Sequence, residues 1–315
     1  MVVRAPRRPL RRVRIAHAFA PGHVTGIFSP AAQARDPRAR GSLGAGVVLD
    51  RGVWAEATFR PGRSRPLRLV SDVAGPLPIS LEVARRMLGP LRGSLVVRLR
   101  HDLPVGQGFG MSAAGALATA LAVGRATGAT RQRAIEVAHL ADLFGGGGLG
   151  GVSAILAGGW ERRVRPGVPP YGRAVHRPFP LRLWIALLGP PLRSPGLLRD
   201  PRFLARVRAR AEAGLHLVER HPSVTVFLKA SERFGDRLGL APPPVRRAIR
   251  RLRSVGASAS QTMFGRSVWA VARRPGVRMR LIRMLESLGY PAVELSAARR
   301  GPWAAPGPLR EEQAF

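Results

Sequence analysis

The sequence predicts an α+β fold in two domains. A length of 315 residues favours two domains over one. In the first half, short apolar runs lead into a glycine-rich loop and an Ala-rich helix. In the second half, strand, helices, strand, helix and strand follow one another, which is an α+β order. The Pro-, Gly- and Arg-rich stretch 162–177 marks the boundary, so we expect domains at 13–165 and 175–300.

The first half alternates strand-like and helix-like segments. Apolar runs of strand length lie at 13–19, 47–49, 53–59 and 94–100. The first of them breaks at Ala20-Pro21-Gly22, and Asp50-Arg51-Gly52 is typical of a hairpin turn between the next two. Helices are predicted over 79–88, 112–124 and 129–143, with Ser80 and Thr130 as candidate N-caps.

The second half is richer in helices. Strands are predicted at 181–188, 267–272 and 292–295, and helices at 201–219, 224–234, 245–255 and 279–288. A small, polar segment at 256–265 (GASASQTMFG) precedes the second of these strands and is expected to be a loop. No internal repeat is present in the sequence.

The segment Leu103–Gly115 (LPVGQGFGMSAAG) places three alternate glycines, Gly106, Gly108 and Gly110, between a strand and a helix. Glycines let backbone N–H groups approach an anion, and the helix N-terminus adds free donors and partial positive charge. Ser112 could cap this helix or bind a metal ion. A glycine-rich turn before a tightly packed helix is the alternative that these residues leave open.

Two familiar nucleotide-binding motifs do not fit this loop. The dinucleotide fingerprint requires a third glycine where the chain has Met111, and a Walker A loop requires a lysine. Lys229 is the only lysine in the sequence and lies in a different segment. A phosphoryl-transfer site here would therefore rely on backbone N–H groups, Mg²⁺ and arginine.

Two other glycine-bearing segments accompany the loop. The run 144–159 (FGGGGLGGVSAILAGG) is costly to order, because each glycine loses much backbone entropy, so close approach to a ligand is expected. The segment Ala20–Pro30 (APGHVTGIFSP) gathers His23, Thr25 and Ser29 around two glycines and could line an anion pocket. The alternative is a turn whose hydroxyl groups satisfy its own backbone.

The charge of the chain attracts polyanions without defining a nucleic-acid site. The net charge is +34 and the pI about 12.0. The arginines are spread along the whole chain, aromatic residues make up 6%, and no zinc-finger or RNA-binding signature is present. We therefore expect nonspecific association with nucleic acid at low salt and no dedicated nucleic-acid function.

The composition also indicates the cellular compartment in which the protein is expected. With no cysteine the chain forms no disulfide and no cysteine metal site, which agrees with a reducing compartment. No stretch approaches the ~18 apolar residues of a membrane helix, and the basic start lacks the apolar core of a signal peptide. We expect a cytoplasmic protein with no membrane partner.

The loop resembles the second signature of the GHMP small-molecule kinases, Pro-x-x-x-Gly-Leu-Gly-Ser-Ser-Ala-Ala. The matching residues are Pro104, Gly108, Gly110, Ser112, Ala113 and Ala114, while Phe109 and Met111 replace the usual Leu and first Ser. The family's first signature corresponds to APGHVTGIF near the N-terminus and its third to 256–271. The resemblance implies an N-terminal α/β domain with the phosphate loop and a C-terminal ferredoxin-like α+β domain.

Within this superfamily the chain is most similar to the archaeal pantoate kinases. The resemblance rests on APGHVTGIF, on GSLGAG at 41–46 and on the AHLAD…GLGGV stretch at 138–152. It implies transfer of the ATP γ-phosphate to the 4-hydroxyl of pantoate, giving 4-phosphopantoate for coenzyme A synthesis. It also implies Mg²⁺ as a cofactor and a homodimer, since similar enzymes are often dimers.

The resemblance assigns roles to particular residues. ATP is expected along the loop, at Pro104, Gly106, Gly108, Gly110, Met111, Ser112, Ala113 and Ala114. Ser112 and Asp142, which stands where the family has Glu, are the expected catalytic and Mg²⁺-binding residues, and Asp suits Mg²⁺ as well. His23, Thr25 and Ser42 are the expected donors to the pantoate carboxylate.

One position departs from the pantoate kinases. They carry Asp in Gly-Leu-Gly-Asp-Val, as the candidate base near the substrate hydroxyl, whereas this chain has Gly151. Three outcomes stay open: a kinase that uses substrate or solvent as proton acceptor, a role for another carboxylate such as Asp142, or altered activity. The alternatives to pantoate kinase are a homoserine, shikimate or mevalonate type of kinase, or a binding protein with weakened catalysis.

Overall fold

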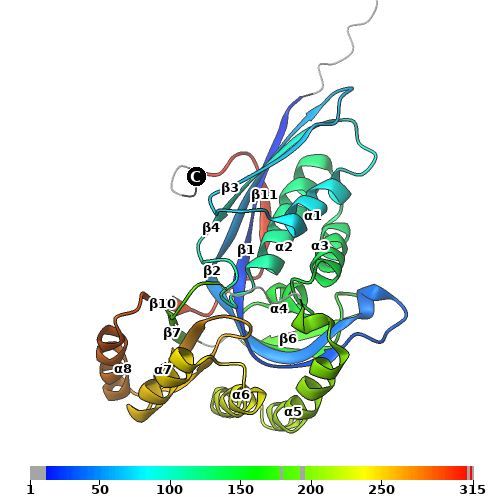
Figure 1. The fold of residues 1–315 in the computed structure, drawn as a ribbon. Coiled ribbons are helices and arrows are strands. Elements are labelled where there is room, and N and C mark those ends of the chain that lie inside the picture. Colours follow the sequence, from blue (N-terminus) through cyan, green and yellow to red (C-terminus); the bar gives the residue numbers. More distant parts are fainter. Residues whose placement is uncertain (1–11, 178–179, 192–195, 311–312, 314–315) are drawn as a thin grey trace, which may run out of the picture.

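The computed structural model describes residues 12–177, 180–191, 196–310 and 313 (Figure 1). Two β-sheets and eight α-helices make up the described part of the chain. The strands are β1 Arg14–Ala31, β2 Gly41–Pro61, β3 Leu67–Ser71, β4 Gly93–His101, β5 Trp160–Arg165, β6 Arg173–Arg177, β7 Arg182–Leu187, β8 Ser258–Gln261, β9 Ser267–Val271, β10 Ala292–Ser296 and β11 Trp303–Pro306. The α-helices are α1 Pro78–Leu88, α2 Met111–Thr127, α3 Arg131–Gly145, α4 Gly151–Ala157, α5 Pro201–Arg220, α6 Val224–Leu238, α7 Pro243–Ser254 and α8 Pro275–Leu288. Short 3₁₀ turns lie at Pro37–Ala39 and Leu197–Arg199.

The larger sheet carries the first half of the chain. Its strands follow the order β11-β1-β2-β4-β3, and the hairpin of β5 and β6 pairs with β2 through β5. Helices α1, α2 and α3 lie together against this sheet (Figure 1). Helix α2 is buried along most of its length. Its alanines have small side chains and its glycines have none, so neighbouring backbones can approach closely.

The two longest strands overturn the hairpin predicted at Asp50-Arg51-Gly52. Strand β2 continues through these residues, and β1 likewise continues through Ala20-Pro21-Gly22. The two strands pair along their whole length, with irregularities in register between Pro21 and His23 and between Thr25 and Ile27. The breaker residues therefore bend the long ribbon at bulges instead of ending it.

The observed helix boundaries agree in part with those predicted from the sequence. Thr130 is the N-cap of α3, where its hydroxyl accepts a hydrogen bond from the Arg133 N–H, as expected. The prediction for Ser80 is wrong, because α1 begins at Pro78 and Ser80 is buried inside the helix against Gly115. Proline suits the first helical position since it lacks the N–H that would be unpaired there. Helix α4 lies in the glycine run, where no helix was predicted.

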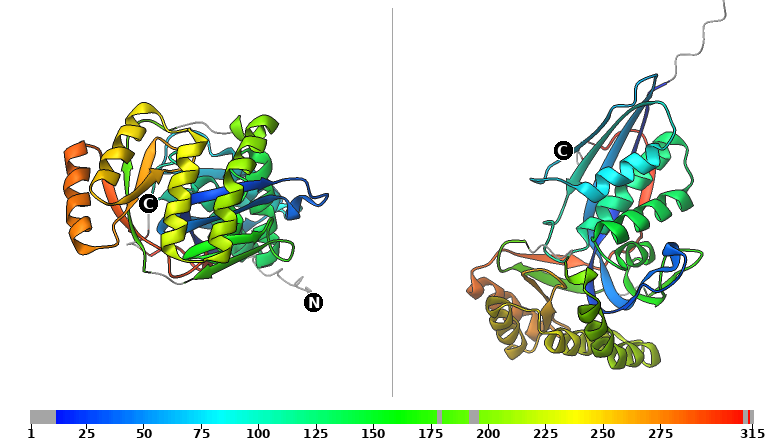
Figure 2. Two further views of the ribbon diagram at one scale, coloured as in Figure 1. Left: turned by 90° about the horizontal axis from the view of Figure 1, so that it is seen from below. Right: turned by 45° about the vertical axis from the view of Figure 1, so that its right-hand side comes forward.

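The smaller sheet forms a ferredoxin-like unit. Its strands follow the order β10-β7-β9-β8 and all pairs are antiparallel. Helices α7 and α8 pack on it around a separate apolar cluster that includes Trp184, Leu252 and Leu281. Helices α5 and α6 instead pack against β1 of the larger sheet and lie side by side beneath it (Figure 2). The predicted α+β fold with a ferredoxin-like C-terminal part is confirmed.

The stretch 162–177 is ordered into the larger sheet. Most of it lies in β5 and β6, and β5 pairs with β2 from Gly44 to Val47. The domain bounds at 13–165 and 175–300 stay a prediction. Within the described ranges, no helix combines the length and apolar character that crossing a membrane requires.

Candidate active site

The three motif segments meet at the start of α2. The loop between β4 and α2 holds Gly106, Gly108 and Gly110 at φ values of 77°, 80° and 67°. Such left-handed backbone favours glycine. No side chain of the described residues caps the N-terminus of α2, so its first N–H groups are available to an anion.

Gln107 holds this loop in place. Its backbone carbonyl oxygen accepts hydrogen bonds from Thr262 Oγ1 at 2.8 Å and Ser267 Oγ at 2.7 Å. Its side chain donates to the Gly189 carbonyl at 2.7 Å and accepts from the Arg266 N–H at 3.1 Å. The segment 256–271 therefore clamps the loop from one side.

The first motif segment contacts the loop from the other side. The His23 N–H donates to the Phe109 carbonyl at 2.9 Å. A Cβ on Gly110 would lie 3.3 Å from three His23 atoms, so the two backbones pass in close contact. The prediction of a loop over 256–265 is wrong in part, because residues Ser258–Gln261 form strand β8. The loop is thus fixed by both flanking segments before any ligand binds.

We expect Gly108→Ala to destabilise the protein more than Gly239→Ala. Both glycines have left-handed φ, of 80° and 70°. A Cβ on Gly108 would lie 2.6 Å from the Met263 carbonyl oxygen and 2.9 Å from Thr262, whereas nothing lies within 4 Å of one on Gly239. The control substitution should cost about 1 kcal/mol from backbone strain alone, and the loop substitution roughly 2 to 4 kcal/mol. Urea unfolding of both variants measures the difference, and equal costs would contradict the clamp.

Ser112 and Asp142 form a pair at this helix end. The Ser112 hydroxyl, in the first turn of α2, donates to Asp142 Oδ1 at 2.6 Å. Asp142 lies near the end of α3 and is buried. A Cβ on Gly147 would collide with both oxygens of this pair, so the backbone of the glycine run passes directly over them. Ser112 does not cap the helix with its side chain.

Burial raises the pKa of Asp142 to about 7, although the Ser112 hydrogen bond lowers it. A nearby divalent cation would favour the ionised carboxylate and reverse this effect. The described residues contain no group of three or more His, Cys, Asp or Glu side chains that could hold a metal ion by themselves. One carboxylate and one hydroxyl next to the glycine loop 103–115 nevertheless fit Mg²⁺, which takes few protein ligands and completes its shell with phosphate oxygens and water.

The expected acceptor-binding residues lie on the β1–β2 ribbon. His23 Nε2 is 2.9 Å from Glu161 Oε1, and Thr25 Oγ1 is 3.4 Å from His23 Nδ1. Burial lowers the pKa of His23. The hydrogen bond to Glu161 acts in the opposite direction on this pKa but does not cancel the effect of burial. Both ring nitrogens of this imidazole are therefore engaged by protein groups. The Ser42 side chain is buried and lies next to Gly150.

Sequence reasoning missed Glu161 and Arg163 on β5. Both are buried, with Arg163 NH1 at 2.5 Å from Glu161 Oε1. Within the described chain, Arg163 Nε and Glu161 Oε2 have no hydrogen-bond partner, and such buried unpaired atoms point to a missing ligand or water. Their i, i+2 spacing on a strand could have revealed a shared face, but the Arg-rich composition suggested a domain boundary instead.

Consecutive glycines join the two halves of the site. A Cβ on Gly150 would collide with Ser42 Oγ and lie 2.9 Å from Arg163 Nε. A Cβ on Gly151 would lie 2.6 Å from the Ala113 Cβ and 3.7 Å from Asp142 Oδ2. One residue step therefore separates the Ser42–Arg163 surface from the Ser112–Asp142 pair, and position 151 has little room for a side chain.

Comparison with known families agrees with this geometry. The family described as GHMP kinases N terminal domain matches residues 79–159. A pantoate kinase of Thermococcus kodakarensis is 31% identical over 267 residues, which span 82% of this chain and 88% of that protein. A pantoate kinase of Methanospirillum hungatei is 26% identical over 288 residues, or 88% and 95% of the two chains.

Solved structures give the same result for the fold. A phosphotransferase related to the CoA biosynthesis pathway superposes with a TM-score of 0.83 at 28% identity, covering 92% of this chain and 98% of the other. A homoserine kinase of Cytophaga hutchinsonii superposes with a TM-score of 0.65 at 14% identity, covering 92% and 97%. The second of these likenesses concerns the fold alone.

Proposed function

This chain belongs to the pantoate kinase family of the GHMP kinases, and from that membership we propose that it transfers the γ-phosphate of ATP to the 4-hydroxyl of pantoate. The product is 4-phosphopantoate, an intermediate of coenzyme A synthesis. The observation that carries the proposal is the one-residue step between Gly150 and Gly151, which joins a phosphate-binding surface to a buried cationic surface.

In this proposal the loop 103–115 binds the ATP phosphates. Its left-handed glycines and the free N–H groups of α2 supply donors in fixed positions. Phosphoryl transfer has a loose transition state, so positioning and charge stabilisation provide most of the catalysis. The hydrogen bonds of Gln107 to the segment 256–271 support this role, because they fix the donors before ATP arrives.

We assign Mg²⁺ binding to Ser112 and Asp142. When bound, Mg²⁺ neutralises charge on the phosphate oxygens. The hydrogen bond between the two side chains already places both oxygens together. Asp142 must lose its proton to bind the ion, so the raised pKa links Mg²⁺ binding to pH.

We assign the pantoate carboxylate to Arg163 and Ser42. Arg163 is the buried arginine of the described chain, and its Nε lies beside Gly150 without a protein partner. A guanidinium that is already held by Glu161 can donate to a carboxylate with little loss of side-chain entropy. Thr25 adds a part-exposed hydroxyl, while His23 acts as a positioning residue for Glu161.

The hydroxyl oxygen of pantoate attacks the γ-phosphorus, the bond to the β–γ bridging oxygen breaks, and ADP leaves. Position 151 offers no carboxylate and little space for one, because Ala113 packs against it. We propose that the hydroxyl proton passes to an oxygen of the transferred phosphoryl group. A loose transition state needs little assistance from a base, which is consistent with this route.

ADP formation with a panel of alcohols tests the assignment. We expect pantoate to support turnover with a kcat/KM at least about a hundredfold above homoserine, shikimate or mevalonate, since only a matched site leaves no buried polar group unpaired. The assay couples ADP to NADH oxidation, with an acceptor-free reaction as control. Equal rates with another alcohol would assign the chain to a different kinase reaction.

Gly151→Asp is expected not to improve turnover by itself. The new Cβ would lie 2.6 Å from the Ala113 Cβ, which forces α2 or α4 to shift. Ala113→Gly relieves this clash, so the double variant Ala113→Gly/Gly151→Asp tests the carboxylate without the steric effect. Rates within about tenfold of wild type in the double variant support base-independent transfer. A larger gain would show that the native chain lacks a base it needs.

We further propose a cytoplasmic homodimer that binds nucleic acid only nonspecifically. The net charge of +34 supports the nonspecific association. Sedimentation velocity tests the dimer, and RNA binding that disappears between low and physiological salt is the result expected for the nonspecific contact.

A further inference from the structure

A basic groove lies between α5 and α6, apart from the proposed kinase site. The cavity has a volume of about 490 Å³, which is within the range of small-molecule sites. Its basic lining residues are Arg210, His216 and Arg220 from α5, His221 just after that helix, and Arg233 and Arg237 from α6. No residue assigned above to ATP, Mg²⁺ or pantoate lines this cavity.

The groove follows from the spacing of residues on two antiparallel helices. On α5 the lining residues recur from 210 to 220 at intervals of three and four, and on α6 from 230 to 237 in the same way. Each set therefore occupies one face of its helix. Ile27 of β1 and Phe234 are buried at the base of the groove, whereas Leu217 keeps 37% of its surface exposed although it is a large apolar side chain.

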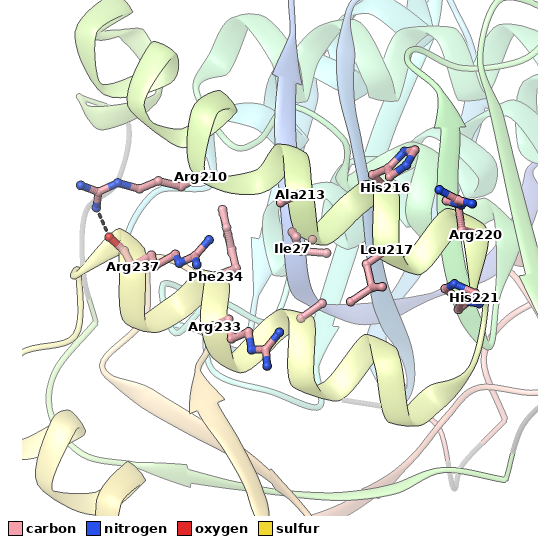
Figure 3. Close-up of a pocket in the computed structure, with 12 residues that line it drawn as sticks. Ile27, Arg210, Ala213, His216, Leu217, Arg220, His221, Arg233, Phe234 and Arg237 are labelled. Atoms are coloured by element: carbon pink, nitrogen blue, oxygen red, sulfur yellow. Dashed lines mark hydrogen bonds between the residues drawn. The ribbon is translucent and has the colours of Figure 1, made fainter.

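Most of the basic groups lie toward the two ends of the groove. Figure 3 shows Arg210 and Arg237 at one end and His216, Arg220 and His221 at the other, with Ile27 and Leu217 between them and Arg233 on the α6 side of this middle part. Ten residues separate Arg210 from Arg220, which places their backbones about 15 Å apart along the helix. Arg210 donates a hydrogen bond to the Arg237 carbonyl and so links the helices at the first end.

The positive charge of the groove is not neutralised by the protein. No acidic residue lines it. In the described part of the chain, none of its four arginines forms an ion pair with a carboxylate, whereas Arg253 behind α6 pairs with Glu232 and Asp236. The acidic residues of α6 thus serve the opposite side of the helix, and the groove keeps a concentrated field of one sign.

We propose that this groove binds a small amphiphilic organic anion with acidic groups at both ends and an apolar middle. The two clusters of guanidinium and imidazole groups match carboxylates or phosphates, and the exposed side chains of Ala213 and Leu217 between them match a hydrocarbon segment. The volume suits a small molecule, and the Arg210 contact bounds one end. The test below also distinguishes this anion from the alternative occupants of the groove, which are a peptide, a nucleic acid or a second copy of the chain.

Isothermal titration of the full chain with sebacate, an α,ω-dicarboxylate, tests the proposal. Decanoate keeps the chain but has one carboxylate, and tripolyphosphate has charge without an apolar part. All titrations are made with ADP, Mg²⁺ and pantoate at saturation, so that the kinase site is filled and no turnover takes place. We expect sebacate to bind at least about tenfold more tightly than either comparison compound, which corresponds to one charge-assisted hydrogen bond or its apolar equivalent.

Three variants separate the groove from general charge effects. Arg220→Glu removes one end cluster, and Ala213→Trp fills the groove from an exposed position that requires no core change. Arg202→Glu is the matched control, since Arg202 is exposed in the first turn of the same helix and does not line the groove. Glutamate is well tolerated there, because a helix N-terminus favours negative charge. Sebacate affinity should fall at least about tenfold in the first two variants and stay within about twofold in the control.

Several results would overturn the proposal. Equal losses in Arg220→Glu and Arg202→Glu would indicate diffuse attraction by net charge, as would stronger binding of tripolyphosphate or RNA than of sebacate. Retained affinity in Ala213→Trp would place the ligand elsewhere. A change from dimer to monomer in Arg220→Glu, measured by sedimentation velocity, would assign the groove to a second copy of the chain.

Discussion

Replacing Asp142 with asparagine is expected to lower kcat by about a hundredfold or more, because the proposed Mg²⁺ site loses the carboxylate assigned to it. Asparagine retains the shape of the side chain and can still accept the Ser112 hydrogen bond. The loss should therefore appear in catalysis without a loss of folding. Steady-state kinetics across a range of Mg²⁺ concentrations measures it, and the dependence on Mg²⁺ should shift to higher concentration.

The same substitution should stabilise the ligand-free protein above neutral pH. The pKa of Asp142 is raised from 3.8 to about 7 by burial. Between these values the folded protein keeps a proton that the unfolded chain has released, so the free energy of unfolding falls as the pH rises from about 4 to 7. Asparagine has no such dependence. We expect Asp142→Asn to raise the free energy of unfolding at pH 8 by up to roughly 4 kcal/mol and to change it little at pH 4.

One control variant and one variant of the partner residue make this prediction specific. Asp236→Asn removes an exposed carboxylate that pairs with Arg253, and should leave kcat unchanged. Ser112→Ala removes the partner hydroxyl and should also lower kcat. Thermal unfolding at pH 4 and pH 8 gives the stability difference. Wild-type turnover in Asp142→Asn would show that this residue does not belong to the Mg²⁺ site. A loss of stability at pH 8 would show that the buried Asp142 carboxylate does not destabilise the folded protein.

Arg163→Met is expected to raise the KM for pantoate by about ten- to a hundredfold, since a charge-assisted hydrogen bond to the substrate carboxylate is lost. The KM for ATP should change little, because the phosphate loop is held by separate contacts through Gln107. Arg162→Met is the matched control on the same strand, where alternate side chains point to opposite faces.

The Arg163 variant also leaves Glu161 buried without its guanidinium partner and with only the His23 hydrogen bond, which costs about 3 to 5 kcal/mol. The double variant Glu161→Gln/Arg163→Met removes the uncompensated charge and should recover most of this stability. Its KM for pantoate should stay high, which separates substrate binding from folding. A double variant that regains both stability and the wild-type KM would show that the buried pair is purely structural.

The glycine loop between β4 and α2 could be predicted from sequence because its backbone conformation depends on consecutive residues. Gly106, Gly108 and Gly110 are needed for left-handed backbone, and such a local demand is visible in the residue types themselves. Thr130 could be recognised as an N-cap for the same reason. The pair of Ser112 and Asp142 joins two helices, and only the family resemblance placed these residues in one site.

The residues proposed to bind the acceptor were harder to predict from sequence, because strand pairing between distant segments brings them together. Glu161 and Arg163 belong to β5, which reaches His23 and Ser42 only through pairing with β2. Their surroundings are rich in arginine, so composition concealed one buried arginine among many exposed ones. The length of β1 and β2 was missed for a related reason, since bulges at Pro21 and Thr25 let the strands continue through residues that usually end them.

The most direct test of the central claim is to identify the phosphorylated product by ³¹P NMR after incubation with ATP, Mg²⁺ and pantoate. We predict a phosphomonoester signal coupled to the protons of the pantoate carbon that carries the 4-hydroxyl, together with one ADP for each product molecule. Formation of ADP and free inorganic phosphate without this ester, or an ester on the other hydroxyl, would contradict the account.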